Sequence, residues 1–189
     1  MSRLSNEDRF TLLELARRAI VSVVSEKRIP DVPMRTGALS VPGGAFVTLH
    51  HSGRLRGCVG QVEHPGPLAE TVVRAAINAA LHDARFPPVV ADELVNLEIE
   101  ISVLSPLEPI APEAVIAGLH GLMIVQGDSR GLLLPQVATE RQWSAPRFLE
   151  ETCAKAGLPS DAWTIPTARI YAFTAEVFSE ASVRAISDI

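Results

Sequence analysis

The sequence predicts an α+β fold of mainly antiparallel sheets with helices flanking them. Segments with helical spacing are interspersed with segments in which apolar and polar residues alternate, and short turns join several strand pairs. Strands joined by short turns pair antiparallel, whereas a doubly wound sheet needs a helical crossover between successive strands. The 189 residues are 47% hydrophobic and 21% charged, which fits one globular domain or two small subdomains with one core.

The first half of the chain predicts two helices and three strands. Apolar residues at helical spacing, preceded by Ser5 and Asp8 as a capping box, predict a helix over residues 6–26. A loop rich in proline and glycine follows over 29–44, with a short strand at 38–41. The other expected elements are a hairpin of strands 45–50 and 55–62, a buried helix over 69–81 and a strand over 97–103.

The second half predicts another hairpin followed by another helix. A short helix over 113–117 precedes strands 122–126 and 132–137, which flank a turn rich in glycine. Ser144 caps a helix that has Pro146 in its first turn and Gly157 just beyond its end, where each residue is favoured. A final strand is expected over 167–178. The repeated order of hairpin and helix is compatible with an internal duplication, which no residue establishes.

Charge and composition argue against several classes of protein. The net charge is −5 and no run of Lys or Arg could follow a phosphate backbone, so we do not expect nucleic acid as a partner. No apolar run approaches the ~20 residues that cross a membrane. The polar N-terminus lacks the features of a signal peptide. We therefore expect a soluble, cytoplasmic protein.

Cys58 is the residue with the greatest chemical potential. Alternation along a strand places Arg56, Cys58 and Gly60 on one face and Gly57 on the other. A cation beside a thiol raises its thiolate fraction, and glycines leave room for a ligand or another backbone. Cys58 is therefore a candidate nucleophile, metal ligand or redox thiol. The alternative is a buried structural thiol, and a disulfide with the distant Cys153 also stays open.

Other candidate residues are acidic or imidazole side chains. Glu98 and Glu100 share the polar face of strand 97–103, where they provide either acid–base function or a solvated surface. The histidines show no metal-binding spacing, so we expect no metal site; they are His50, His51, His64, His82 and His120. His120 is the most interesting because it lies where two predicted elements meet.

Residues 83–88 close the second predicted helix with an ion pair and an aromatic residue. Asp83 and Arg85 supply the charges, Phe86 the ring, and two prolines stop the helix. The segment is either a simple helix end or part of the lining of a pocket. In the second case Arg85 is a candidate for contact with a substrate.

These motifs together resemble the AMMECR-domain family, known in prokaryotes as AmmeMemoRadiSam system protein A. The match extends over nearly the whole chain. It rests on the segments 55–60, 83–88, 97–105, 120–122, 131–138 and 155–159, together with Trp143 and Trp163. Val59 stands where isoleucine is common, a change that conserves volume closely enough to raise no doubt.

The resemblance implies a single AMMECR domain over 4–186, built from two interleaved α/β subdomains. It also implies a cleft around Cys58 and a pathway shared with a Memo-type protein and a radical-SAM protein. We expect either an enzyme or enzyme subunit acting on a small molecule, or a non-catalytic binding module for those partners. The candidate catalytic residues are Cys58, Arg56, Glu98 and His120, and the candidate binding residues are Gly57, Gly60, Arg85 and Glu100. Cofactor and oligomeric state are not specified.

Overall fold

A computed structural model describes residues 4–62 and 65–187 of the chain. The chain forms two compact units. The first contains the described residues up to Leu104 and those from Glu176 onward, and the second contains Ser105–Ala175. The second unit is thus inserted between two strands of the first. Each unit holds a four-stranded sheet with helices, so the predicted α+β class is confirmed.

The first unit is built around a sheet of strand order β2-β1-β3-β8. The hairpin β1–β2 and the strand β3 pair antiparallel. The strands are β1 (Ala45–His51), β2 (Arg54–Gln61), β3 (Leu97–Leu104) and β8 (Ala175–Ser179). The helices are α1 (Asn6–Val21), α2 (Leu68–Leu81) and α5 (Glu180–Ser187), with shorter helical turns η1 (Ser22–Glu26), η2 (Gly37–Ser40) and η3 (Ala91–Asn96). Since β2 ends the strand order, it is an edge strand.

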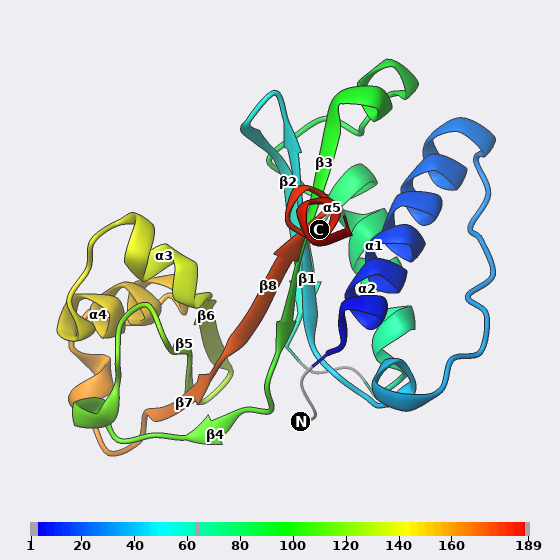
Figure 1. The fold of residues 1–189 in the computed structure, drawn as a ribbon. Coiled ribbons are helices and arrows are strands. Elements are labelled where there is room, and N and C mark those ends of the chain that lie inside the picture. The colour runs from blue at the N-terminus through cyan, green and yellow to red at the C-terminus, as the bar shows by residue number, and fades with distance from the viewer. Residues whose placement is uncertain (1–3, 63–64, 188–189) are drawn as a thin grey trace. The chain divides into compact units, whose positions relative to one another are not determined.

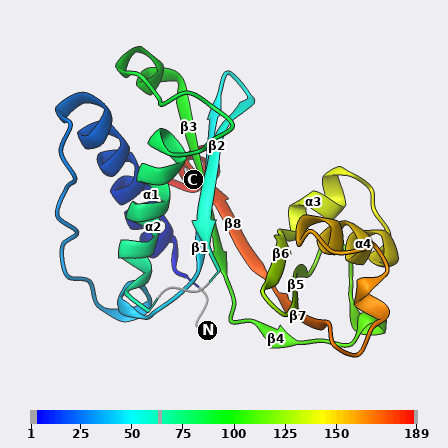
Figure 2. The ribbon, with the colours of Figure 1, turned by 180° about the vertical axis from the view of Figure 1, so that it is seen from behind.

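Helices α1 and α2 lie together on one side of this sheet, as both views show (Figures 1 and 2). The core forms where their apolar residues meet the alternate residues of the strands. Val47 and Leu49 of β1 and Ile99 of β3 are fully buried in it. Strand alternation turns the residues between them to the opposite side, which we call the far face. The burial pattern therefore fixes which side chains of β1, β2 and β3 are kept out of the core.

The second unit has a sheet of strand order β4-β7-β5-β6. Its strands are β4 (Glu108–Pro109), β5 (Gly121–Gln126), β6 (Ser129–Leu133) and β7 (Arg169–Phe173). Its helices are α3 (Pro135–Glu140) and α4 (Ala145–Lys155), with turns η4 (Pro112–Ala114) and η5 (Ala162–Thr164). Phe148 and Leu149 of α4 are buried against the sheet residues Leu122 and Ile124. The Ser144 cap and the Pro146 position are as predicted.

Several predicted elements differ from the structure near their ends. The first helix changes to a π-helical turn at Ser22, whose hydroxyl bonds Glu26 and the carbonyl of Arg28. The predicted strand at 38–41 is wrong. It lies mostly in a 3-10 helix that begins at Gly37, whose φ is positive, and that buries Leu39. The short helix at 113–117 is a single 3-10 turn, Pro112–Ala114.

Two further differences affect the strands of the second half. Strand β6 begins earlier and ends sooner than predicted, because Pro135 starts helix α3 with its fixed φ and missing N–H. The final strand, expected over 167–178, is divided at Thr174 into β7 and β8, which belong to different sheets. Among the residues that the structure describes, no helix is long and apolar enough to cross a membrane.

Candidate functional site

Three side chains form a row across the far face of the first sheet. Thr48 of β1 pairs with Cys58 of β2 on one side and with Glu100 of β3 on the other. Directly paired residues project from the same face of a sheet, so the three side chains are neighbours. All three are partly exposed. The Thr48 hydroxyl donates a hydrogen bond to the Cys58 sulfur, with Oγ1 and Sγ 3.3 Å apart. The row joins a thiol, a hydroxyl and a carboxylate.

Other atoms of the protein fill the space beside Gly57 and Gly60, the two glycines of segment 55–60. A Cβ at Gly57 would lie 2.2 Å from the carbonyl oxygen of Ala79, so the glycine lets helix α2 pack directly on β2. A Cβ at Gly60 would lie 2.3 Å from the carbonyl oxygen of Ala45 and 2.4 Å from the Phe46 ring. The sequence left open whether these glycines admit a ligand or another part of the protein. In the structure Gly57 admits the backbone of α2, and Gly60 admits both the backbone of β1 and the Phe46 ring.

Asp83 and Arg85 close the edge of the sheet at Cys58. The backbone N–H of Cys58 donates to Asp83 Oδ2 at 2.8 Å, and its carbonyl oxygen accepts from Arg85 Nη2 at 3.2 Å. The two side chains also bind each other, with Nε–Oδ1 and Nη2–Oδ2 distances of 2.9 and 2.7 Å. An ion pair thus takes the place that a further strand would occupy, which protects an otherwise exposed edge.

Arg85 of this ion pair interacts electrostatically with the Cys58 side chain as well as with Asp83. The hydrogen bond from Arg85 holds the pKa of the Asp83 carboxyl far below its usual range, although burial opposes the shift. The pKa of Arg85 is raised, first by its hydrogen bond to Asp83 and to a smaller extent by the Cys58 side chain. The Arg85 side chain is 56% exposed and the Asp83 side chain 6%. Arg85 is therefore a cation close to Cys58 that also faces solvent.

Arg56 is held in a different set of contacts. It falls where the β1–β2 register shifts, and its guanidinium binds Glu93 through Nε at 2.7 Å and Nη2 at 2.9 Å. It also donates to the carbonyl oxygens of Pro87 and Pro88, at 2.8 and 3.3 Å. The hydrogen bond from Arg56 lowers the pKa of Glu93. These contacts tie β2 to the segment after α2, so segments 55–60 and 83–88 meet in space.

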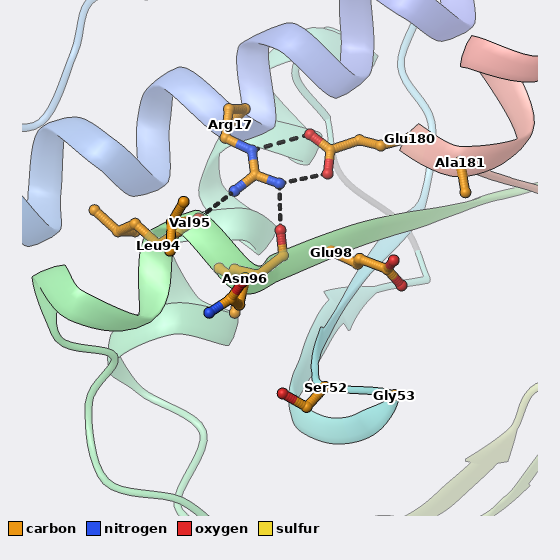
Figure 3. A pocket seen from close by; sticks show the side chains of 10 residues that line it. Arg17, Ser52, Gly53, Leu94, Val95, Asn96, Glu98, Glu180 and Ala181 are labelled. Carbon is orange, nitrogen blue, oxygen red and sulfur yellow. Dashed lines mark hydrogen bonds and ion pairs between the residues drawn. The ribbon is translucent and has the colours of Figure 1, made fainter.

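Glu98 lies on the far face but outside the row of Cys58. Its cross-strand partner is His50, two residues beyond Thr48 on β1. Its side chain lines a pocket of about 510 Å³ together with Arg17 and Glu180 (Figure 3). Neither Cys58 nor Glu100 lines that pocket. The two carboxylates predicted as a pair therefore face different surroundings.

His120 belongs to the second unit, whereas the residues described above belong to the first. Its Nδ1 accepts a hydrogen bond from the backbone N–H of Ile116 at 3.1 Å, which closes the turn before β5. His64 lies outside the described residues. Within residues 4–62 and 65–187, no three side chains of His, Cys, Asp or Glu are grouped as metal ligands.

Sequence reasoning missed Thr48 and Glu93. Thr48 alternates with the apolar residues of its strand, which is the one local signal that it leaves the core. Its position between Cys58 and Glu100 depends on strand register, which the sequence does not provide. Glu93 carries no signal beyond its charge, since its partner Arg56 lies 37 residues away.

Comparison with known proteins gives one consistent result. Residues 13–178 match the profile of the AMMECR1 family. A protein of Methanothermobacter thermautotrophicus is 43% identical over 188 residues, covering 94% of this chain and 96% of that protein. Protein TK0174 of Thermococcus kodakarensis is 43% identical over 192 residues, covering 95% and 94%.

A solved structure agrees with this assignment. The crystal structure of uncharacterized protein PH0010 from Pyrococcus horikoshii is similar, with a TM-score of 0.85 and 42% identity. The match covers 92% of each chain. The fold of this chain is therefore shared with that protein. The resemblance to the AMMECR-domain family is confirmed, and the chain belongs to the AMMECR1 family.

Proposed function

We propose that this protein is an enzyme or enzyme subunit in which Cys58 contacts or reacts with a small molecule at the far face of the first sheet. The observation that carries the proposal is the row of Cys58, Thr48 and Glu100. The family resemblance adds a pathway shared with a Memo-type protein and a radical-SAM protein. A pathway implied by resemblance is a weaker argument than site geometry, so the chemistry stands first.

The row offers separate chemical roles. The Thr48 hydroxyl that donates to Cys58 stabilises negative charge on the sulfur. Strands β2 and β3 lie on either side of β1, so their backbones are roughly 10 Å apart. Glu100 is therefore placed to exchange a proton with a molecule lying between it and Cys58, while Arg85 supplies positive charge for an anionic group.

The remaining candidates take supporting roles. Arg56, Gly57 and Gly60 shape and fix the strand that carries the thiol, since their contacts are with Glu93, α2 and Phe46. Glu98 is a candidate for ligand binding in its own pocket.

A non-catalytic binding module is the second candidate. The observation that favours it is the large share of the motif that packing explains, from Gly57 against α2 to the bidentate pair of Arg56 and Glu93. In that case Cys58 contributes a half-buried surface and Arg85 an exposed charge for a docking partner. The two candidate functions differ in whether the Cys58 sulfur must be chemically reactive.

Alkylation at neutral pH separates them. If Cys58 is a reactive thiol, we expect iodoacetamide to alkylate it about tenfold faster than it alkylates the thiol of glutathione. The reason is that the thiolate fraction sets the rate of alkylation. Thr48→Val keeps the shape of the side chain, removes the donated hydrogen bond and should slow the reaction. Cys153 is an internal control, since it is fully buried and burial raises its pKa. A rate at or below that of glutathione, unchanged in Thr48→Val, favours the binding module.

Partner binding is tested independently. A Memo-type protein and a radical-SAM protein would each be titrated into this protein by calorimetry, beside an Arg85→Gln variant. The binding module predicts association that the loss of the exposed cation weakens. An absence of association with either partner, combined with a fast Cys58 reaction, leaves the enzyme as the function.

A further inference from the structure

The pocket that Glu98 lines is built from five parts of the first unit. Arg17 comes from α1, Glu180 and Ala181 from the start of α5, and Glu98 from β3 (Figure 3). The β1–β2 turn supplies Ser52 and Gly53, and η3 and the start of β3 complete the lining with residues 94–97. A volume of about 510 Å³ lies within the range of small-molecule sites.

One wall of the pocket is a closed ion pair. Arg17 Nε donates to Glu180 Oε1 at 2.9 Å, and Nη2 bonds the other carboxylate oxygen. The guanidinium also donates to the carbonyl oxygens of Leu94 and Leu97, and Glu180 accepts from the backbone N–H of Ile99. The charges of Arg17 and Glu180 therefore balance each other, and four of the five N–H donors of the guanidinium are already used. An anionic ligand gains little from such a guanidinium.

The opposite side of the pocket carries a charge that is not balanced. Among the described residues Glu98 has no ion-pair or hydrogen-bond partner, its cross-strand neighbour His50 included. Figure 3 shows its carboxylate apart from the bonded pair of Arg17 and Glu180. Ser52 and Asn96 add polar side chains to the same lining. With one pair neutral and one carboxylate unpaired, the pocket has a net charge that attracts cations.

We propose that this pocket is a binding site for a small polar molecule that carries a positively charged amine. Glu98 supplies the counter-charge, and Ser52 and Asn96 supply hydrogen bonds to the rest of the molecule. The Arg17–Glu180 pair acts as a rigid wall. The site is separate from the row of Cys58, so it stands whether or not that thiol reacts.

Three probes of equal chain length test the proposal. Putrescine, succinate and 1,4-butanediol carry four carbons each and are cationic, anionic and neutral. Each would be titrated into the whole protein, followed by the backbone amide resonances of the pocket, at a pH above the usual range of histidine. We expect saturable shifts at Ser52, Gly53 and Glu98 with putrescine only. Saturation with succinate, equal binding of the neutral diol, or no saturation with putrescine would overturn the proposal.

Substitutions identify the carboxylate responsible. Glu98→Gln should weaken putrescine binding about fivefold or more, since it removes one charge at close range. Glu70→Gln makes the same change of charge on the exposed side of α2 and should leave binding unchanged. Glu98→Lys should abolish putrescine binding altogether. Equal effects of Glu70→Gln and Glu98→Gln would show a general charge effect and contradict the site.

Discussion

In both units a glycine in a β-hairpin lets a helix pack closely on the sheet. The two hairpins differ in the side chains that they carry on the opposite face. In the first unit Gly57 pairs with Leu49, and its missing Cβ lets Ala79 of α2 approach. In the second unit Gly131 pairs with Ile124, and a Cβ there would lie 2.3 Å from the backbone nitrogen of Ala156, just beyond α4. An arginine precedes the glycine in both strands. The glycine of the Arg-Gly pair is thus explained by packing in both units.

The two units differ in the row of cross-strand neighbours one position beyond the glycine. In the first unit it is Cys58, Thr48 and Glu100. In the second the corresponding row is Leu132, Met123 and Tyr171, which is largely apolar. Helix packing on the glycine therefore does not require polar residues in that row. The comparison assigns Gly57 to the fold and leaves the polar row as the part of the motif that packing does not explain.

The largest expected effect comes from the two packing glycines. Gly57→Ala and Gly131→Ala should each lower the free energy of unfolding by about 3 kcal/mol, because the new Cβ would overlap a helix backbone that cannot rotate away. Gly127→Ala is the control. It has open space and a positive φ of 58°, so it should cost only about 1 kcal/mol. Denaturant unfolding measures the stability of all three variants. A small loss of stability in Gly57→Ala beside a large loss in Gly131→Ala would show that the two glycines do not play the same packing role.

A smaller effect is expected at the edge of β2. Asp83→Ala should cost about 2 kcal/mol, because it leaves the Cys58 N–H and the Arg85 guanidinium without their acceptor. The exposed guanidinium is partly screened by solvent, which limits the loss.

Asp83 also gives stability a dependence on pH. Since its folded pKa lies below the ordinary value of 3.8, its contribution is fully present above that value and declines as the pH falls toward the folded pKa. Unfolding curves of the wild type and Asp83→Asn should therefore converge in acid. A constant difference between the two down to the acid limit would show that the charge of Asp83 is not what stabilises the edge.

The smallest expected effect distinguishes Arg56 from Arg130, the arginines that precede Gly57 and Gly131. Arg56→Lys should cost about 1 kcal/mol, because a lysine cannot reproduce the bidentate contact with Glu93. Arg130 is exposed and has no ion pair among the described residues, so Arg130→Lys should leave the unfolding midpoint unchanged. Comparable shifts in both variants would mean that Arg56 acts through helix or strand propensity instead of through Glu93.

The sequence predicted the fold class, the hairpins and the family. These rest on local periodicity, turn residues and motif order, which are properties of neighbouring residues. It could not predict that one extended segment, 167–178, serves two different sheets on either side of Thr174. Which strand a segment joins depends on contacts distant in the chain.

The surroundings of Cys58 were decided by tertiary structure alone. Alternation gave Arg56 as the companion of the thiol, whereas the fold brings Thr48 across the strand and Arg85 to the sheet edge. Glu98 and Glu100, adjacent on one strand face in the sequence, line different surroundings. The sequence by itself determined which residues leave the core, because alternation is local. Only the register and the packing of α2 determined which of them meet, because those depend on residues far apart in the chain.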